Sequence, residues 1–300
     1  MSSSRPADSL LPRFALLSLL LLSCACRTVS GPTPLIWQVS GERNDIYLLG
    51  SMHVLRPDDY PLPAPFASSY LDAEQLVMEL DLDDLQPADI QRAMGELGID
   101  PERRTLAELM GEAAWSRALG AAEKIDIDLR TFQAYEPWVV SLLVVDLQMQ
   151  RLGFKVEHGI EAHYVDRARA DGKSITGLET VDQQFAFFDQ MPLAVQREFL
   201  LKSIEDAQQV PQRMDALVAS WKNGDELFLQ RELVDSFADF PELYDALVSE
   251  RNERWTGEIE KLASTDDDVL VIVGALHLVG EDSVVARLRQ RGYVVRRFSD

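Results

Sequence analysis

The 300 residues include 29 Lys and Arg against 50 Asp and Glu, which gives a formal net charge of −21. Such an acidic chain argues against nucleic acid as a partner, since phosphate binding needs basic patches. It also argues against docking of the folded part on an anionic membrane surface. The length suits one large domain or two small ones, and 46% hydrophobic residues are enough for a substantial core.

The N-terminus has the pattern of an export signal rather than of a folded element. Arg5 and Arg13 precede an apolar run over residues 14–22, which is too short to span a bilayer as a mature helix. The next residues complete Leu21-Leu22-Ser23-Cys24, which resembles the lipobox of bacterial lipoproteins. In that motif the cysteine becomes the lipidated first residue of the mature protein.

We therefore predict a lipoprotein-type signal peptide over residues 1–23, lipidation at Cys24 and a tether over residues 24–34. Two alternatives stay open: Cys26 as the lipidated residue, and an ordinary signal peptide cut before Leu35. Both cysteines lie in this segment, so we expect no disulfide and no cysteine nucleophile in the folded part. The expected location is the periplasmic face of a bacterial membrane, with the outer membrane favoured and the lipid anchor as the membrane contact.

Beyond the tether, the pattern predicts an α/β protein with α+β character and a central mixed sheet. Residues 35–39 and 46–49 flank a polar turn, which predicts a β-hairpin. Between about residues 85 and 265, apolar residues recur at three- and four-residue steps, which predicts a large helical insertion. We expect residues 35–300 to form a single domain whose terminal segments build the sheet. Further strands are predicted at residues 76–80, 174–178, 269–273 and 293–297.

Proline and glycine divide the second half of the helical portion. We expect breaks there because proline lacks the amide hydrogen of a helix interior and glycine favours helix ends. The expected positions are Pro192, Pro211, Gly224 and Pro241.

Two segments far apart in the chain share an apolar run that ends in Gly-x-x-His. The first contains Gly50 and His53, and the second contains Gly274 and His277. Such a run predicts a buried strand, and glycine at its end permits a sharp exit or a close approach that a Cβ would block. If both strands lie in one sheet and end at the same edge, the imidazoles would converge. The alternative is that each histidine caps a loop through a backbone hydrogen bond.

Two neutral imidazoles and a carboxylate are a common ligand set for a catalytic divalent metal. Glu79 is the natural third member, because it lies at the end of an apolar strand where a carboxylate needs solvent or a partner. Asp81 is a less favoured alternative. His158 and His163 are five residues apart, a step that turns about 140° around a helix, so we expect them to be surface or structural residues. Glu161 between them could reach a site near the start of that helix.

Arg251 and Asn252 lie in a charged helical stretch. An arginine there commonly pairs with a nearby glutamate, and its functional interpretation is a guanidinium that binds a developing oxyanion. The chain has no Gly-x-Ser-x-Gly elbow, no Walker loop and no dinucleotide glycine fingerprint. Serine hydrolases of that type, P-loop enzymes and dinucleotide-binding proteins are therefore excluded, and Ser51 is interpreted as a loop residue.

Five short segments occur in order along the chain: Tyr47–His53, Met78–Asp81, Gly177–Thr180, Glu250–Asn252 and Val273–Leu278. Together they resemble the TraB/GumN family, over about residues 35–297. That family includes the bacterial PrgY and GumN proteins and is similar to the animal Tiki proteases.

The resemblance implies a fold that gathers both Gly-x-x-His motifs and a carboxylate at one site. In Tiki-like members it implies divalent-metal-dependent peptide hydrolysis, with manganese or cobalt as the usual metals. Carried over to this chain, it marks His53, His277 and Glu79 as metal ligands. Glu79 is also a candidate general base, and Arg251 and Asn252 are candidate catalytic residues that support the site.

Two carboxylates are left without an assigned role. Glu179 falls in the family's Leu-Glu-Thr segment, and Glu161 stands where family members commonly have Asp. We expect an exported, lipid-anchored hydrolase that uses Mn, Co or Zn on a peptide or protein substrate, and leave its oligomeric state open. One alternative is a non-catalytic lipoprotein that binds a peptide or a metal. The other is a metal-free esterase-like hydrolase, similar to the erythromycin esterases, with His53 as the base.

Overall fold

The computed structural model describes residues 33–299. The predicted signal peptide, Cys24 and most of the predicted tether lie outside these residues. Within the described range, none of the helices combines the length and the apolar character needed to cross a bilayer.

A six-stranded mixed sheet with the order β4-β3-β5-β2-β1-β6 forms the centre of the fold. The predicted hairpin is present, since β1 and β2 pair in antiparallel register from Ile36↔Leu49 to Ser40↔Asp45. Strands β2, β5, β3 and β4 are parallel neighbours, so their carboxyl ends meet at one edge. The bounds are β1 Ile36–Ser40, β2 Asp45–Ser51, β3 Gln75–Leu80, β4 Ile175–Glu179, β5 Val269–Gly274 and β6 Val295–Arg297.

This arrangement confirms the predicted fold class, a mixed sheet with a large helical portion. All six residues of β5 are buried, because the strand lies between β2 and β3 and is covered on both faces. Such strands carry continuous apolar runs rather than alternating ones, which explains the pattern that identified β5 in the sequence.

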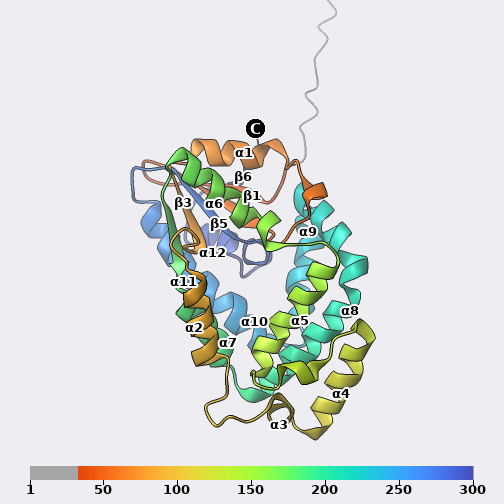
Figure 1. The fold of residues 1–300 in the computed structure, drawn as a ribbon. Helices are drawn as coiled ribbons and strands as arrows, with labels where there is room; N and C mark the ends of the chain where they lie inside the picture. The colour runs from red at the N-terminus through yellow and green to blue at the C-terminus, as the bar shows by residue number, and fades with distance from the viewer. Residues whose placement is uncertain (1–32, 300) are drawn as a thin grey trace, which may run out of the picture. The chain divides into compact units, whose positions relative to one another are not determined.

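Helices account for most of the remaining chain (Figure 1). Helices α3 and α4 lie at the end of the helical portion farthest from the sheet. The bounds are α1 Ala64–Asp72, α2 Pro87–Leu97, α3 Leu106–Met110, α4 Glu112–Ala122, α5 Pro137–Arg151, α6 Ile160–Asp171, α7 Val181–Asp189, α8 Leu193–Asn223, α9 Glu226–Leu229, α10 Pro241–Tyr244, α11 Glu250–Leu262 and α12 Val284–Gln290.

Helix α8 joins the helical portion to the sheet. Leu200 and Ile204 in its first half belong to an apolar cluster formed with α4 and α5. Met214 and Trp221 in its second half belong to the apolar cluster around the sheet, and the Trp221 indole donates to the carbonyl of Gly50 at 2.7 Å. The helix therefore fixes the helical portion against the end of β2.

One expected helix break is absent. Pro192 and Gly224 bound α8 and Pro241 begins α10, but Pro211 lies inside α8. The neighbouring Val210 and Met214 are buried in the sheet cluster. Their burial stabilises a continuous helix despite the amide hydrogen that proline lacks, so the prediction of a break at Pro211 was wrong.

The segment between α9 and α11 is irregular. It contains two π-helical stretches, η5 over Gln230–Val234 and η7 over Asp245–Ser249. Single π-helical turns occur frequently at functional sites. The η7 stretch runs directly into α11, the helix that begins with Glu250 and Arg251.

Candidate active site

The carboxyl ends of the four parallel strands bring the sequence-predicted residues to one edge of the sheet. His53 follows β2, Glu79 lies near the end of β3 and Glu179 ends β4. His277 lies on the short helical turn η8, Ala275–Leu278, which follows β5. Helix α11 adds Arg251 and Asn252 from outside the sheet.

Gly274, the last residue of β5, lies between these side chains. A Cβ built on it would be 3.2 Å from Nε2 of His53, 3.3 Å from Oε1 of Glu79 and 3.6 Å from Cδ2 of His277. Its backbone angles, φ −51° and ψ 139°, are open to other residues. Glycine is therefore needed here for space, and the three side chains surround a common point.

Glu79 is a buried, ionised carboxylate. Its Oε1 accepts the amide hydrogen of Gly274 at 2.8 Å, and its Oε2 accepts from Nη2 of Arg251 at 2.7 Å. Burial disfavours the charged form, but Arg251 and the two histidines outweigh that effect and lower the pKa of Glu79 to about 2. The carboxylate is thus deprotonated at neutral pH.

His53 is held by a carboxylate from α6. Its Nδ1 lies 2.8 Å from Oε1 of Glu161, and the hydroxyl of Ser51 donates to the same oxygen at 2.5 Å. Because an ionised carboxylate only accepts, Nδ1 carries a proton, and Nε2 faces Oε1 of Glu79 at 4.0 Å. The charge of Glu161 raises the pKa of His53 to about 9. For Glu161, burial opposes ionisation, but His53 and Ser51 hold its pKa below the ordinary value.

A glycine brings Glu161 to this position. A Cβ on Gly159, directly before α6, would lie 2.1 Å from the carbonyl oxygen of His53. The amide of Ile160 donates to the carbonyl of Met52 at 3.1 Å. The first turn of α6 therefore packs against the chain leaving β2, and the glycine before that helix was the signal in the sequence for the role of Glu161.

His277 has a different environment. It is only 4% exposed, its ring centroid lies 4.5 Å from that of Trp255, and its Nδ1 lies 2.7 Å from Oδ1 of Asn252. The amide nitrogen of Asn252 donates to the carbonyl of Asp282, which turns the amide oxygen toward the imidazole. Nδ1 of His277 is therefore protonated. Burial lowers the pKa of His277 to about 3 in spite of the nearby Glu79, so the ring is neutral.

Arg251 connects the carboxylates of two strands. Its Nη2 donates to Glu79 at 2.7 Å and to Glu179 at 3.0 Å, and its Nε donates to Glu179. The guanidinium carbon lies 4.5 Å from the ring centroid of Trp255, and Nη1 approaches Nε2 of His277 at 3.4 Å. Burial disfavours this charge, but the two glutamates outweigh it and raise the pKa of Arg251. Glu179, whose role was left open, also accepts from Arg254 and positions Arg251.

The structure thus brings together His53, Glu79, Arg251, Asn252 and His277, and adds Glu161 and Glu179. The contact of Asn252 is with the imidazole of His277, which indicates a positioning residue. Sequence analysis missed three further contributors, namely the Gly274 amide, the Ser51 hydroxyl and the Trp255 ring.

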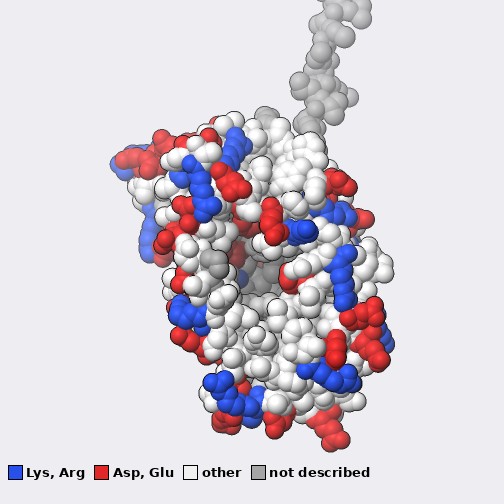
Figure 2. Space-filling view, in the orientation of Figure 1, with Lys and Arg blue, Asp and Glu red and all other residues white. Residues whose placement is uncertain are grey.

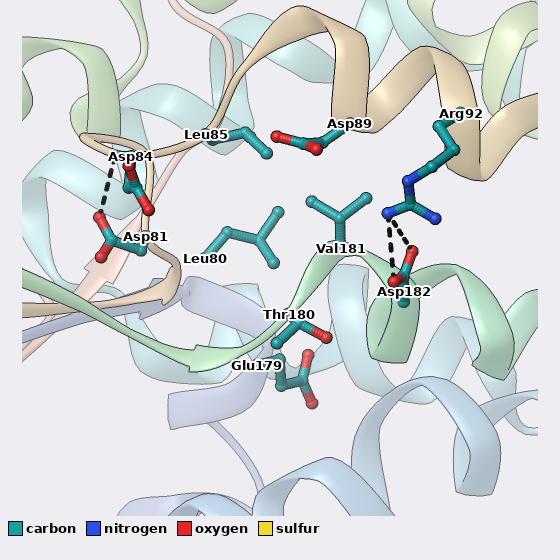
Figure 3. A pocket seen from close by; sticks show the side chains of 10 residues that line it. All are labelled: Leu80, Asp81, Asp84, Leu85, Asp89, Arg92, Glu179, Thr180, Val181 and Asp182. Atoms are coloured by element: carbon teal, nitrogen blue, oxygen red, sulfur yellow. Dashed lines mark hydrogen bonds and ion pairs between the residues drawn. The ribbon is translucent and has the colours of Figure 1, made fainter.

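Three residues considered in the sequence lie elsewhere. Asp81 accepts the amide hydrogen of Asp83 at 3.2 Å and lines a neighbouring pocket of about 230 Å³, whose wall also includes Glu179. Figure 3 shows that pocket, where Arg92 binds both carboxylate oxygens of Asp182. The carbonyl of His158 accepts from Tyr60, and the ring of His163 packs against that of Tyr60.

The donor set of the site suits a divalent cation. Each imidazole engages its Nδ1 hydrogen with an oxygen, which is the usual arrangement of metal-bound histidine. However, no group of three or more His, Cys, Asp or Glu among residues 33–299 has metal-binding geometry. Nη1 of Arg251 lies 3.4 Å from Nε2 of His277, the ring nitrogen that a metal would use. Such a contact is a weak hydrogen bond, and the metal assignment stays a prediction that rests on the chemistry of the donor atoms.

The site lies in a cleft. Two cavities of about 390 Å³ and 330 Å³ both include His53, Glu79, Phe188 and Arg251 in their walls. Figure 2 shows a hollow in the middle of this face, with uncharged side chains below it and charged side chains of both signs above it and at its sides. Pockets of this size and character are typical of small-molecule and peptide sites.

Comparison with known proteins agrees with the sequence motifs. The TraB/PrgY/gumN family matches residues 35–297. The chain is 26% identical over 246 residues to the uncharacterized protein YbaP of Escherichia coli K12, an alignment that covers 81% of this chain and 87% of YbaP. It is also 24% identical over 303 residues to an uncharacterized protein of Treponema pallidum, covering 92% of this chain and 89% of that protein. No solved structure matches.

Proposed function

The chain belongs to the TraB/PrgY/gumN family, and from this premise we propose that it is a hydrolase. The reaction centre is formed by His53, Glu79, Arg251 and His277. The observation that carries the proposal is the meeting of two Nδ1-protonated imidazoles and an ionised carboxylate around Gly274. A buried guanidinium lies beside them, and the centre opens into a cleft.

A divalent cation, manganese, cobalt or zinc, fits this donor set, with Nε2 of His53, Nε2 of His277 and the Glu79 carboxylate as ligands. Such a cation would supply a Lewis acid and a water of lowered pKa. A pKa of about 2 makes Glu79 a poor general base at neutral pH, which favours its role as a ligand. Glu161 and Asn252 hold the two Nδ1 hydrogens and so keep both Nε2 atoms directed into the site.

Arg251 is the group suited to charge that develops on a substrate oxygen. Its guanidinium is buried, fixed by Glu79 and Glu179, and reaches the wall of both cavities. A donor held in place before the reaction stabilises an oxyanion without reorganisation. The proposed substrate class is a peptide or protein, because the cavity walls beyond the reaction centre are mostly apolar.

A second candidate is a hydrolase that works without a metal. It is favoured by the contact of Arg251 with His277 and by the Glu161–His53 pair, in which a carboxylate orients an imidazole as in a catalytic triad. Because the pKa of His53 is raised to about 9, the ring could accept a proton from water only at alkaline pH, so this version predicts an alkaline optimum. If the protein hydrolyses no substrate with or without a metal, the remaining interpretation is a lipoprotein that binds a peptide or a metal without catalysis.

The experiment is a peptide-library digest with the purified full chain, run with and without a chelator. The proposal expects cleavage that the chelator removes and that Mn²⁺, Co²⁺ or Zn²⁺ restores. Cleavage that survives chelation selects the metal-free version. Absence of cleavage under every condition, together with unchanged metal affinity in a His53→Ala variant, contradicts a hydrolase centre.

The proposed location depends on Cys24. We propose export and lipid anchoring at the periplasmic face of a bacterial membrane, supported by the lipobox-like Leu21–Cys24. Cells given a labelled fatty acid should label the wild-type chain and not a Cys24→Ser variant, with Cys26→Ser as the matched control. Labelling that is lost in Cys26→Ser instead would assign lipidation to Cys26. No labelling of the wild-type chain would contradict lipid anchoring.

A further inference from the structure

We infer that the cleft takes an internal segment of an extended peptide, with a large apolar side chain on each side of the reacting bond. This inference rests on the proposed hydrolase function and specifies its substrate. It follows from two cavities that meet at the reaction centre and from the positions of the charges in their walls.

The first cavity, here called the aromatic cavity, has a volume of about 390 Å³. Beyond the reaction centre its wall contains Phe185 and Phe188 of α7, Leu142 of α5 and Val156. Val156 is 59% exposed, so it borders the mouth rather than the floor. These apolar surfaces suit a large aliphatic or aromatic side chain.

The second cavity, here called the methionine cavity, has a volume of about 330 Å³. Its wall contains Met52, Met149 and Met214 together with Leu217 and Leu233. Thioether side chains adapt to irregular shapes and are frequent on surfaces that bind varied apolar partners. This cavity therefore suits apolar side chains of more than one shape.

The two cavities meet at the reaction centre, because both include His53, Glu79 and Arg251, and apart from Phe188 their other wall residues differ. Successive side chains of an extended chain point in opposite directions. A bond placed at the centre would thus direct the residue before it into one cavity and the residue after it into the other.

The positions of the charges point to an internal bond. Among the described residues that line the two cavities, the ionisable ones are His53, Glu79, Glu161, Arg251 and His277. All of them belong to the reaction centre. The outer walls therefore offer no charge for the α-amino or α-carboxylate group that an exopeptidase recognises, and an internal segment avoids burying such a terminus without a partner.

The test uses fluorogenic peptides that are acetylated and amidated at their ends, with Leu on both sides of one bond or Ala replacing Leu on either side. The inference expects cleavage at that internal bond and a loss of about tenfold or more in kcat/KM for each Leu→Ala replacement, as for a truncated group in an apolar pocket. Cleavage that requires a free terminus, or equal rates for Leu and Ala, would overturn it.

Cavity-filling variants test each side separately. Val156→Trp should lower kcat/KM for Leu on one side of the bond only, and Leu217→Trp for Leu on the other side only. Leu233→Trp fills the same cavity as Leu217→Trp from the irregular segment η5, in case Leu217→Trp does not fold. The matched control is Leu227→Trp, at an 81% exposed position on α9 outside both cavities. Variants that all affect the same side would contradict two cavities of separate function.

A binding measurement separates this inference from the proposed function. The blocked Leu-Leu peptide, labelled with a fluorophore, is titrated into the full-length His53→Ala variant, and polarisation is followed. Binding that Val156→Trp and Leu217→Trp weaken supports the cleft even if the wild type cleaves no peptide, in which case only the hydrolase proposal fails. Cleavage by the wild type without any preference for apolar residues would support the hydrolase proposal and contradict the inference about its substrate.

Discussion

The two Gly-x-x-His segments place their histidines in opposite environments. The side chain of His53 is 59% exposed and binds a carboxylate, which raises its pKa to about 9. His277 is 4% exposed and binds an amide, and its burial lowers the pKa to about 3. The motif and the strand context are the same, yet one ring favours the protonated form and the other the neutral form.

The difference shows that the motif determines where a histidine lies, whereas its neighbours determine its charge. Strands β2 and β5 are parallel and end at the same edge of the sheet, so the strand that precedes each histidine determines its position. The neighbours come from inserted helices: Glu161 from α6 for His53, and Asn252 with Trp255 from α11 for His277. A shared feature remains, since both rings donate through Nδ1 and direct Nε2 into the site.

Replacing either histidine should give the largest effect. We predict that His53→Ala and His277→Ala each lower kcat/KM by at least about 100-fold. The two variants should differ in stability, because His277 is buried against Asn252 and Trp255. His277→Ala should lower the free energy of unfolding by about 3 kcal/mol through a cavity and an unpaired amide oxygen. His53→Ala should lower it by less, because the ring is 59% exposed and only its ion pair with Glu161 is lost. Urea denaturation measures both values, and equal losses would contradict the comparison.

Gly274→Ala tests whether the reaction depends on the close packing around Gly274, because the change leaves every functional group in place. The added methyl group would lie 3.2 Å from His53 and 3.3 Å from Glu79 without removing any functional group. Because a displacement of about 1 Å at a reaction centre can cost about 100-fold, we predict a loss of 10- to 100-fold in activity with an intact fold. Gly257→Ala on α11, where a Cβ meets no atom within 4 Å, is the control and should leave activity unchanged. Wild-type activity in Gly274→Ala would place the reaction away from this glycine.

Titration of the rings should test their opposite charges directly. In chelator-treated protein, histidine NMR should show His53 losing its proton near pH 9 and His277 remaining neutral down to about pH 3. Glu161→Gln should move the pKa of His53 toward 6.5, because the largest contribution to its shift is the charge of Glu161. Two rings that titrate together near 6.5 would mean that the local partners do not act as described.

The same shifts predict how stability depends on pH. The raised pKa of His53 contributes stability that is present below 6.5 and is lost as the pH rises through about 9. The lowered pKa of His277 acts in the opposite sense. As the pH falls from 6.5 toward 3, His277 binds a proton in the unfolded chain but stays neutral in the folded protein, so stability falls. Unfolding curves of His277→Ala should therefore lose part of the acid sensitivity, and unchanged curves would contradict this assignment.

Removing the Ser51 hydroxyl should have the smallest effect. It donates to the oxygen of Glu161 that also holds His53. Ser51→Ala should lower the free energy of unfolding by about 1 kcal/mol, the usual value of one hydrogen bond, and raise the pKa of Glu161, because that hydrogen bond favours its ionised form. A loss of activity as large as that of His53→Ala would assign Ser51 a direct part in the reaction.

The convergence of the two histidines could be predicted because its causes are local in sequence. Apolar runs identify β2 and β5 as buried strands, and parallel pairing then places Ser51 opposite Gly274. The conformation of glycine was less predictable. Neither Gly50 nor Gly274 has a positive φ, so at both positions the residue serves a close approach rather than a sharp exit.

The neighbours that set the charge of each ring could not be predicted in the same way. Glu161 is 108 residues from His53, and Asn252 is 25 residues from His277. Helical periodicity indicates an apolar face but does not say which polar side chain on the opposite face meets a distant strand end. The continuous helix through Pro211 is a similar case, since burial of its flanking residues outweighs a local preference.

The most direct test of the central claim, that both imidazoles serve one centre, is a crystal structure of the protein soaked in Zn²⁺. The account predicts one ion with Nε2 of His53 and Nε2 of His277 each at about 2.0–2.1 Å, and Glu79 as a further ligand. An ion bound by only one of the two histidines, or bound elsewhere with both rings unchanged, would contradict it.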